Sequence, residues 1–324
     1  MSTAGIGVGT EAKRSIGVGV IGVGSLGRHH ARIYSQLPGV RLVGVADVRE
    51  ERAREVAGVY GARAYTDYRG LLGRVEAVSI AVPTTLHAEI GAAFLREGAH
   101  VLVEKPMAAD LAGADRLLEA AEAAGRVLQV GHVERFNPVL AAVLDQIRGP
   151  RFFEGHRLGV FVPRSLDVDV ILDLMIHDLD LVLWLTGEEI VDIRAVGIPI
   201  LTPRVDIANA RLQFSGGCVA NLTASRVSRE RVRKLRLFQF HDYISLDFHG
   251  RTVEMYSLAE ANGERRVVER HPTVTEAEPL REELRAFLQA VRTGEAPRQC
   301  CSGEQGRAAL AAALQVVNLA RQAL

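Results

Sequence analysis

The chain has 324 residues, with 39 basic and 39 acidic side chains. This length exceeds what one hydrophobic core usually holds, so we expect two domains. The balanced charge, without long runs of one sign, argues against a nucleic-acid-binding protein or a membrane-surface protein, and the longest apolar stretches have only strand length. Three cysteines are too few for a disulfide framework, so we expect a reducing, cytoplasmic location.

Residues 1–14 lack the apolar core of a signal peptide and are predicted to form a disordered tail. After this tail, an apolar strand over 16–21 runs directly into Gly22-x-Gly24-x-x-Gly27. Gly22 permits a tight turn, Gly24 lets the backbone approach a pyrophosphate, and Gly27 lets the next helix pack closely on the strand. This stretch therefore predicts a dinucleotide-binding site.

A carboxylate at the end of the second predicted strand supports this interpretation. The strand over 40–46 ends in Asp47, which can accept hydrogen bonds from both ribose hydroxyls. The N–H groups at the helix start, around Ser25 and Leu26, suit phosphate oxygens. Because Asp47 would repel a 2′-phosphate, we expect NAD rather than NADP, although Arg49 lies close enough to soften that preference.

From residue 15 to residue 134 apolar runs alternate with amphipathic helical patterns. Strands are predicted over 16–21, 40–46, 62–65, 75–82, 100–103 and 127–131. Helices are predicted near 26–37, 49–58, 67–73, 85–98 and 110–124. This alternation predicts an α/β Rossmann domain with a doubly wound parallel sheet and a ligand at the carboxyl ends of the strands.

The pattern changes over 135–324, where strands follow one another without helices between them. Helices are predicted near 138–147, 170–186, 278–293 and 303–323. Strands are predicted over 151–161, 189–199, 206–214, 217–225, 230–240, 242–248, 251–257 and 265–270. Such an order predicts an α+β domain with a largely antiparallel sheet.

Glu104-Lys105-Pro106 follows the predicted strand 100–103 and so lies at the carboxyl edge of the sheet, beside the cofactor. Desolvation and the positive charge of an oxidised nicotinamide would lower the pKa of Lys105 toward neutrality, where it can act as an acid or base. The alternative is a surface turn. Pro106 restricts Lys105 to extended geometry and can adopt the cis form.

Asp173 and His177 fall on one face of the predicted helix 170–186, since positions i and i+4 are neighbours. The carboxylate can fix the tautomer of the imidazole and support its charged form. The alternative is a buried core histidine. Asp178 and Asp180 make a metal site conceivable, but the set offers one imidazole only, so we expect no metal.

Pro83, Thr84 and His87 follow the fourth predicted strand. Thr84 or Thr85 can cap the next helix, whereas His87 can donate to a phosphate or ribose of the cofactor.

His132, Arg135 and Asn137 lie where the parallel pattern ends, and a domain junction favours a ligand cleft. Arg135 and Asn137 are predicted either to bind substrate or to join the domains. Three arginines of the second domain can bind a diphosphate through bidentate hydrogen bonds or can be surface charges: Arg157, Arg164 and Arg226.

The segments GVIGVGSLGRHHA, AVPTTLH, EKP, GHVERFNP and DLMIHDLDLVLWL, with Asp47, together resemble the glucose–fructose oxidoreductase/inositol dehydrogenase (Gfo/Idh/MocA) superfamily. The resemblance covers nearly everything after the tail. It implies a Rossmann domain and a second domain whose open sheet serves substrate binding and assembly into a homodimer or homotetramer. It also implies that Lys105, Asp173 and His177 are catalytic and line a sugar ring opposite the nicotinamide. Met175 stands where the family often has glycine.

Within the superfamily, GHVERFNPV, VDIANARLQF, CVANLTASRVS and KLRLFQFHDYISLDF are similar to dehydrogenases that oxidise the 3-hydroxyl of UDP-N-acetylglucosamine for lipid A synthesis. The similarity implies a UDP-sugar substrate, with the 3-hydroxyl between Lys105 and His177, one of which takes its proton. Asp173 would orient His177.

The sequence leaves alternatives open. They are another nucleotide sugar, a free polyol such as inositol, a dinucleotide-binding sensor without catalysis, and a metal-assisted lyase. The residues expected at the cofactor are Gly22, Gly24, Ser25, Leu26, Gly27, Asp47, Pro83, Thr84, His87, Glu104, Lys105 and His132. Those expected at the substrate are Lys105, Arg135, Asn137, Arg164, Asp173 and His177.

Overall fold

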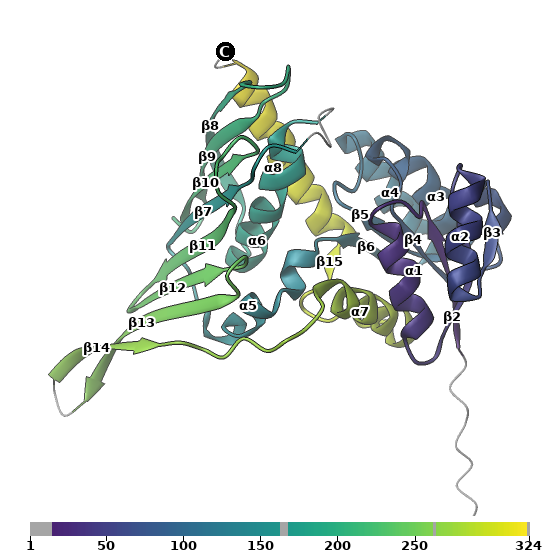
Figure 1. The fold of residues 1–324 in the computed structure, drawn as a ribbon. Coiled ribbons are helices and arrows are strands. Elements are labelled where there is room, and N and C mark those ends of the chain that lie inside the picture. The colour runs from purple at the N-terminus through teal and green to yellow at the C-terminus, as the bar shows by residue number, and fades with distance from the viewer. Residues whose placement is uncertain (1–14, 163–167, 262–263, 323–324) are drawn as a thin grey trace, which may run out of the picture.

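The computed structural model describes residues 15–162, 168–261 and 264–322. The tail predicted for 1–14 and the predicted ligand Arg164 lie outside these ranges. Two sheets face each other across a layer of helices that includes α6 and α8 (Figure 1). Among the described residues, no helix is both long and apolar enough to cross a membrane.

The first sheet has the strand order β15-β6-β5-β4-β1-β2-β3. Its strands are β1 (Ile16–Ile21), β2 (Val40–Ala46), β3 (Arg63–Tyr65), β4 (Ala77–Ile80), β5 (His100–Glu104), β6 (Leu128–Gly131) and β15 (Cys301–Ser302). Every pairing is parallel except that of β15 with β6. The order reverses between β1 and β4, which confirms the predicted doubly wound sheet and places its switch point beside the glycine turn.

Helices cover both faces of this sheet, so β1 and β4 are buried along their whole length. The helices of the first half are α1 (Gly27–Gln36), α2 (Glu50–Tyr60), α3 (His87–Arg96) and α4 (Leu111–Ala124). The predicted helix 67–73 is wrong, because only a 3₁₀ turn, Tyr68–Leu71, forms there. A Cβ on Gly70 would lie 2.4 Å from the Tyr65 ring, and Gly73 has a φ of +67°, so the chain turns instead of continuing as a helix.

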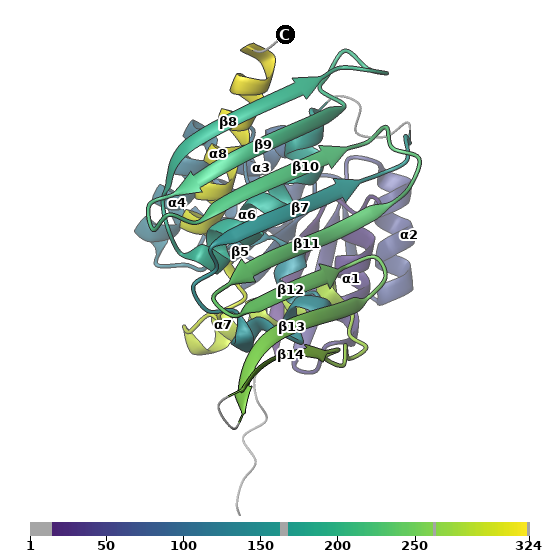
Figure 2. The same cartoon turned by 90° about the vertical axis from the view of Figure 1, so that its left-hand side faces the viewer.

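The second sheet has the order β14-β13-β12-β11-β7-β10-β9-β8, and Figure 2 looks onto its outer face. Its strands are β7 (Phe152–Leu158), β8 (Ile190–Ile198), β9 (Ile207–Phe214), β10 (Val219–Ser225), β11 (Val232–Gln239), β12 (Asp242–Asp247), β13 (Thr252–Ala261) and β14 (Glu264–Arg270). Only β7 and β10 pair in parallel, so the expected largely antiparallel sheet is confirmed.

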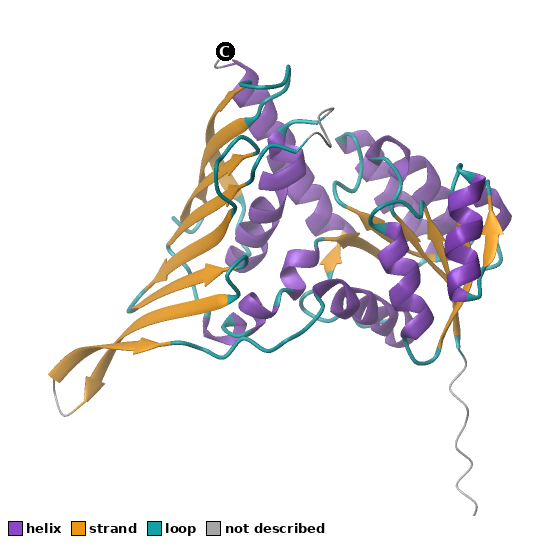
Figure 3. Ribbon diagram, in the orientation of Figure 1, coloured by secondary structure: helices purple, strands orange, loops and turns teal. Residues whose placement is uncertain are grey.

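The remaining helices pack on the inner face of this sheet or return to the first one (Figure 3). They are α5 (Pro138–Ala141), α6 (Ile176–Thr186), α7 (Pro279–Thr293) and α8 (Gly303–Gln322). The helix predicted over 138–147 is wrong, because α5 ends after one turn and Val143 adopts a φ of −132° before a 3₁₀ turn. The helix predicted over 170–186 begins as a π-helix, Ile171–Met175, and continues as α6.

The end of the chain completes the core of the first sheet. Leu284, Phe287 and Leu288 of α7 are buried against Ile16 and Tyr34, and β15 pairs with β6. Strands β1 to β6 precede residue 134 and strands β7 to β14 follow it, whereas β15 and α7, which come after the second sheet in sequence, pack with the first sheet.

Candidate active site

A cavity of about 1080 Å³ opens at the carboxyl ends of β1, β2, β4 and β5. The predicted residues that line it are Gly22, Gly24, Ser25, Leu26, Asp47, Pro83, Thr84, His87, Glu104, Lys105 and Asp173. They come from five separate stretches of sequence. Because β1 and β4 flank the switch point, the cavity lies where a doubly wound sheet binds its ligand.

The glycines at the cavity do what their spacing predicts. Gly22 has a φ of +80°, and a Cβ at Gly27 would lie 1.8 Å from the carbonyl oxygen of Gly22, so α1 starts directly against the turn. At Gly24 a Cβ would meet only the end of the Arg52 side chain, at 3.6 Å. The backbone at Gly24 is thus open to a ligand, whereas Gly27 serves close packing.

Asp47 is 8% exposed and is held in place by the loops around it. Its two carboxylate oxygens accept the backbone N–H groups of Val23, at 3.1 Å, and Arg49, at 2.9 Å. Arg52 lies 3.4 Å from the same group. Oδ1 keeps a second lone pair for a ribose hydroxyl, whereas Oδ2 also accepts a hydrogen bond from Arg52. The glycine cradle and this acidic group together fit a dinucleotide with an unphosphorylated ribose, namely NAD.

The turn after β4 differs from the prediction. Neither Thr84 nor Thr85 caps a helix with its side chain, because the residues at the N-caps are Pro83 and Leu86. Both ring nitrogens of His87 lie 2.9 Å from backbone carbonyl oxygens, those of Val82 and Pro106. Burial lowers the pKa of His87 and so favours the neutral ring, in which one nitrogen donates to one of these carbonyls. His87 thus joins the β4 turn to the Lys105–Pro106 turn.

Lys105 reaches from the first unit to the helix that leads into α6. Its Nζ donates to the backbone carbonyl of Asp173 at 2.8 Å and lies 3.8 Å from the Asp173 carboxylate. Burial lowers the pKa of Lys105 from its ordinary value, and the charge of Arg157 lowers it further, against the opposing effect of Asp173 and Glu104. The Lys105–Pro106 peptide bond is cis.

His177 lies one turn after Asp173. Burial holds its pKa well below the ordinary histidine value, and the charges of Lys105 and Arg157 add to this effect, so its ring is neutral. Its Nδ1 is buried and has no hydrogen-bond partner in the part of the chain that the structure describes. The expectation that Asp173 orients His177 is therefore wrong, because the Asp173 carboxylate lies beside Lys105.

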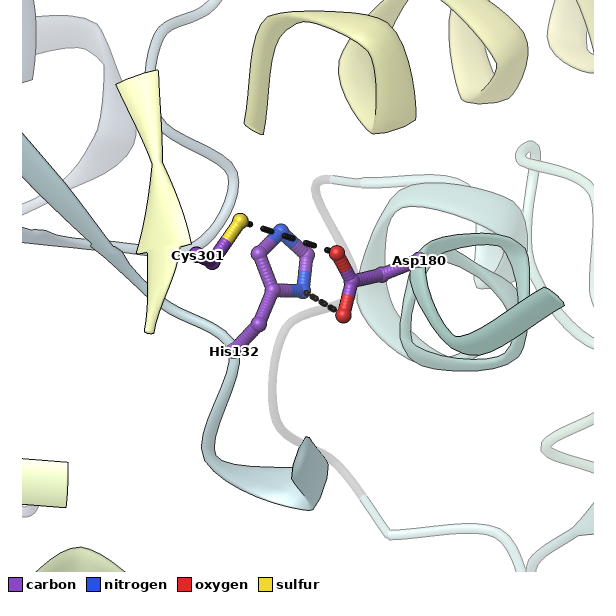
Figure 4. A group of neighbouring side chains, drawn as sticks. All are labelled: His132, Asp180 and Cys301. Carbon is purple, nitrogen blue, oxygen red and sulfur yellow. Dashed lines mark hydrogen bonds and ion pairs between the residues drawn. The ribbon is translucent and has the colours of Figure 1, made fainter. Parts of the chain in front are cut away.

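A buried polar cluster lies behind these residues and holds His132, Asp180 and Cys301 (Figure 4). His132 Nδ1 and Cys301 Sγ each lie 3.6 Å from an Asp180 oxygen, and the His132 and His177 rings stand edge to face at 6.5 Å. His132 is only 1% exposed and lies outside the cavity lining, so the predicted contact of His132 with the cofactor is not seen at this cavity.

The same cluster offers three ligand types within 4.8 Å of one another, as a metal would need. However, Arg135 takes both Asp180 oxygens, at 2.6 and 2.8 Å, and places a fixed positive charge there. Burial also raises the pKa of the Cys301 thiol well above its ordinary value and so keeps it protonated. These features disfavour a bound cation.

Arg135 and Asn137 bind groups of the protein itself and join parts of the fold. Arg135 is 2% exposed and donates to Asp180 and to the side chain of Gln305. Asn137 caps α5 through the Val139 N–H and donates to Glu134. The geometry therefore supports the alternative prediction, in which this segment joins the two units.

Two of the arginines suggested for a diphosphate also have structural partners. Arg157 is 3% exposed and binds Asp178 at 2.7 Å and Glu134 at 2.9 Å. Arg226 donates to the backbone carbonyl of Val205. No local sequence pattern indicates the Arg157 cluster, because the acidic partners of Arg157 lie 21 and 23 residues away in sequence.

A Rossmann cradle for NAD, with a lysine of lowered pKa at its mouth, defines a dinucleotide-dependent oxidoreductase. Residues 16–132 match the family model described as the oxidoreductase family with an NAD-binding Rossmann fold, and residues 146–241 match a Gfo/Idh/MocA C-terminal domain. The chain belongs to the Gfo/Idh/MocA oxidoreductase family.

Relatives within the family are similar over almost the whole chain. UDP-N-acetylglucosamine 3-dehydrogenase from Acidithiobacillus ferrooxidans is 42% identical, with 92% of this chain and 95% of that protein covered. A solved structure of that enzyme superimposes with a TM-score of 0.89, covering 95% of this chain and 99% of the other at 41% identity. Myo-inositol 2-dehydrogenase from Thermotoga maritima is 28% identical, with 90% and 92% covered.

Proposed function

We propose that this protein is an NAD-dependent dehydrogenase that oxidises the 3-hydroxyl of UDP-N-acetylglucosamine to a 3-keto nucleotide sugar. The observation that carries the proposal is Lys105, a desolvated amine at the mouth of the cofactor cavity, anchored 2.8 Å from the Asp173 carbonyl. The near full-length similarity to an enzyme named for this reaction supports the choice of substrate.

The roles follow from charge and position. Lys105 in its neutral form takes the proton of the substrate hydroxyl, and burial, which lowers the pKa of Lys105, favours that form. Bound against the glycine turn and Asp47, NAD would supply the hydride acceptor for the carbinol carbon. His177, which burial keeps neutral, holds the hydroxyl in line by a hydrogen bond and does not compete with Lys105 for the proton.

Asp173 acts on the lysine. Its carboxylate, 3.8 Å from Nζ and one-third exposed, stabilises the ammonium that forms when the proton arrives. Its backbone carbonyl fixes where Nζ lies. Asp173 is therefore part of the proton-accepting unit and balances its charge during the reaction.

The substrate is tested with purified protein, NAD and a panel of UDP-N-acetylglucosamine, other UDP-sugars and free inositols. Reduction of the product with borodeuteride then marks the oxidised carbon for mass spectrometry. We expect deuterium at C3 of the UDP-sugar and a much lower rate with inositols. Turnover confined to inositols, or deuterium at another carbon, would contradict the proposal.

The cellular setting is part of the same proposal. A 3-keto nucleotide sugar suits transamination on a route to lipid A, and we expect the reaction in the cytoplasm. We also expect a homodimer or homotetramer formed through the outer face of the second sheet, where rings of Phe152, Phe238, Tyr243 and Tyr256 stack in a row with centroids 5.1–5.8 Å apart. Sedimentation analysis tests that assembly.

A further inference from the structure

Arg233 lies on the inner face of the second sheet. Leu235 and Leu237 of the same strand, β11, are fully buried in the core beneath the sheet, whereas Lys234 and Arg236 pair with acidic groups of neighbouring strands. Because side chains alternate along a strand, Arg233 shares the inward face with the two leucines. It is near the start of β11, where the residue is exposed.

The strand register places Arg233 next to the active site. It stands directly opposite Arg157 across the β7–β11 pair, on the same face. Arg157 binds Asp178, the residue that follows His177. Arg233 is thus one strand beyond Arg157, which contacts the helix that carries His177. The charge of Arg233 lowers the pKa of His177.

The surroundings of Arg233 favour an anion. Arg157 takes the nearest carboxylates, Asp178 and Glu134, at 2.7 and 2.9 Å, while among the described residues no carboxylate oxygen lies within 4.0 Å of the Arg233 guanidinium. Partial burial and the neighbouring charges of Arg157 and Arg231 lower the pKa of Arg233, against the attraction of the two carboxylates. A guanidinium in these surroundings is stabilised by a bound phosphate oxygen, which supplies a negative charge and accepts its hydrogen bonds.

We propose that Arg233 binds the diphosphate of the nucleotide-sugar substrate on the inner face of the second sheet, opposite Arg157. The inference rests on the proposed function, since it needs a diphosphate on the sugar. Arg157 and Arg226 bind groups of the protein itself, whereas Arg233 has no carboxylate partner among the described residues and supplies the guanidinium for the diphosphate.

The spacing suits such a substrate. The 3-hydroxyl and the anomeric phosphate of a pyranose are carried by C3 and C1, two positions apart on one sugar ring. With the 3-hydroxyl beside Lys105 and His177, the diphosphate therefore lies close to these residues, and Arg233 is near enough for its charge to lower the pKa of His177. Free inositols have no such group and gain nothing from this residue.

The test compares Arg233→Gln and Arg233→Lys with the matched control Lys234→Gln, one residue along the strand on the opposite face. Loss of a charged hydrogen bond should raise the KM for UDP-N-acetylglucosamine and the Kd for UDP about 10- to 100-fold in Arg233→Gln, with the NAD Kd unchanged. The KM and Kd of the Arg233→Lys variant should lie between those of wild type and Arg233→Gln, because lysine keeps the positive charge but cannot form the bidentate hydrogen bond. The control should match wild type.

Calorimetry of UDP binding to the NADH-loaded protein separates this inference from the proposed function. If wild type oxidises UDP-N-acetylglucosamine and Arg233→Gln binds UDP as wild type does, the diphosphate role is overturned and the function stands. If wild type binds UDP but oxidises a different UDP-sugar, a weakened Arg233→Gln still supports the diphosphate role. If wild type binds no UDP, both are overturned.

Discussion

Lys105 and Asp173 meet across the two units of the molecule, with Nζ of Lys105 2.8 Å from the Asp173 carbonyl and 3.8 Å from its carboxylate. Lys105 follows β5 of the first sheet, and Asp173 lies in the π-helix before α6, under the second sheet. The position of the amine therefore depends on how the two units pack. This contact ties the fold to the proposed chemistry.

Replacing Lys105 by Met removes the proposed proton acceptor and keeps the length of the side chain. We expect kcat for oxidation to fall about 10²- to 10⁴-fold, the usual contribution of a positioned acid or base. NAD binding, measured by fluorescence or calorimetry, should persist. A variant with near wild-type turnover would remove Lys105 from the mechanism.

The pH dependence of kcat/KM reports the Lys105 pKa, because activity rises as the amine loses its proton. Burial puts this limb below the ordinary lysine range. Asp173 raises the pKa of Lys105, so Asp173→Asn should move the rising limb to lower pH and lower kcat. A limb that stays in place would show that the carboxylate does not act on the lysine.

His177 is expected to position the hydroxyl while neutral. The His177→Ala variant should lose at least about tenfold in kcat. Since burial keeps the pKa of His177 well below its ordinary value, the wild-type profile should show no limb from this residue near pH 6.5, a value typical of free histidine. A limb there that disappears in His177→Ala would contradict the neutral assignment.

Asp47 is expected to bind the adenosine ribose. Asp47→Ala should weaken NAD binding by about 1.5–3 kcal/mol, the range for a hydrogen bond to a charged group. The NADP-to-NAD affinity ratio should rise, since the repelling carboxylate is gone and Arg49 and Arg52 remain beside the cavity. Because Asp47 also holds two loop N–H groups, thermal unfolding serves as the control for folding.

Arg135 is expected to stabilise the fold through Asp180. Arg135→Leu leaves Asp180 as an uncompensated buried charge, which typically costs about 3–5 kcal/mol. The midpoint of thermal unfolding should drop clearly, while the KM for substrate of the remaining folded enzyme stays close to wild type. An unchanged midpoint with a raised KM would restore the substrate-binding interpretation.

The sequence was sufficient to predict the features that depend on short local patterns. The Gly22-to-Gly27 turn, Asp47 at a strand end and Lys105 at another all lie where the strand–helix alternation predicts, because parallel strands bring their carboxyl ends to one edge. The same logic predicted both sheets. Each of these features depends on a few residues close together in the chain.

What the sequence could not supply are contacts between distant segments. An amphipathic helix such as α7 shows that it packs on something, but not that its partner is the first sheet. The partners of Arg135, Arg157 and Asp173 follow from packing between the units. From the sequence alone, each of these residues could therefore equally be a substrate ligand or a structural residue.

The most direct test of the account follows NADH formation by its absorbance when purified protein meets NAD and UDP-N-acetylglucosamine, with a ketone trap to draw the reaction forward. We predict steady NADH formation that depends on the UDP-sugar and is lost in Lys105→Met. No NADH above the no-sugar control, in protein shown separately to bind NAD, would contradict the proposed substrate and the role of Lys105 toward it.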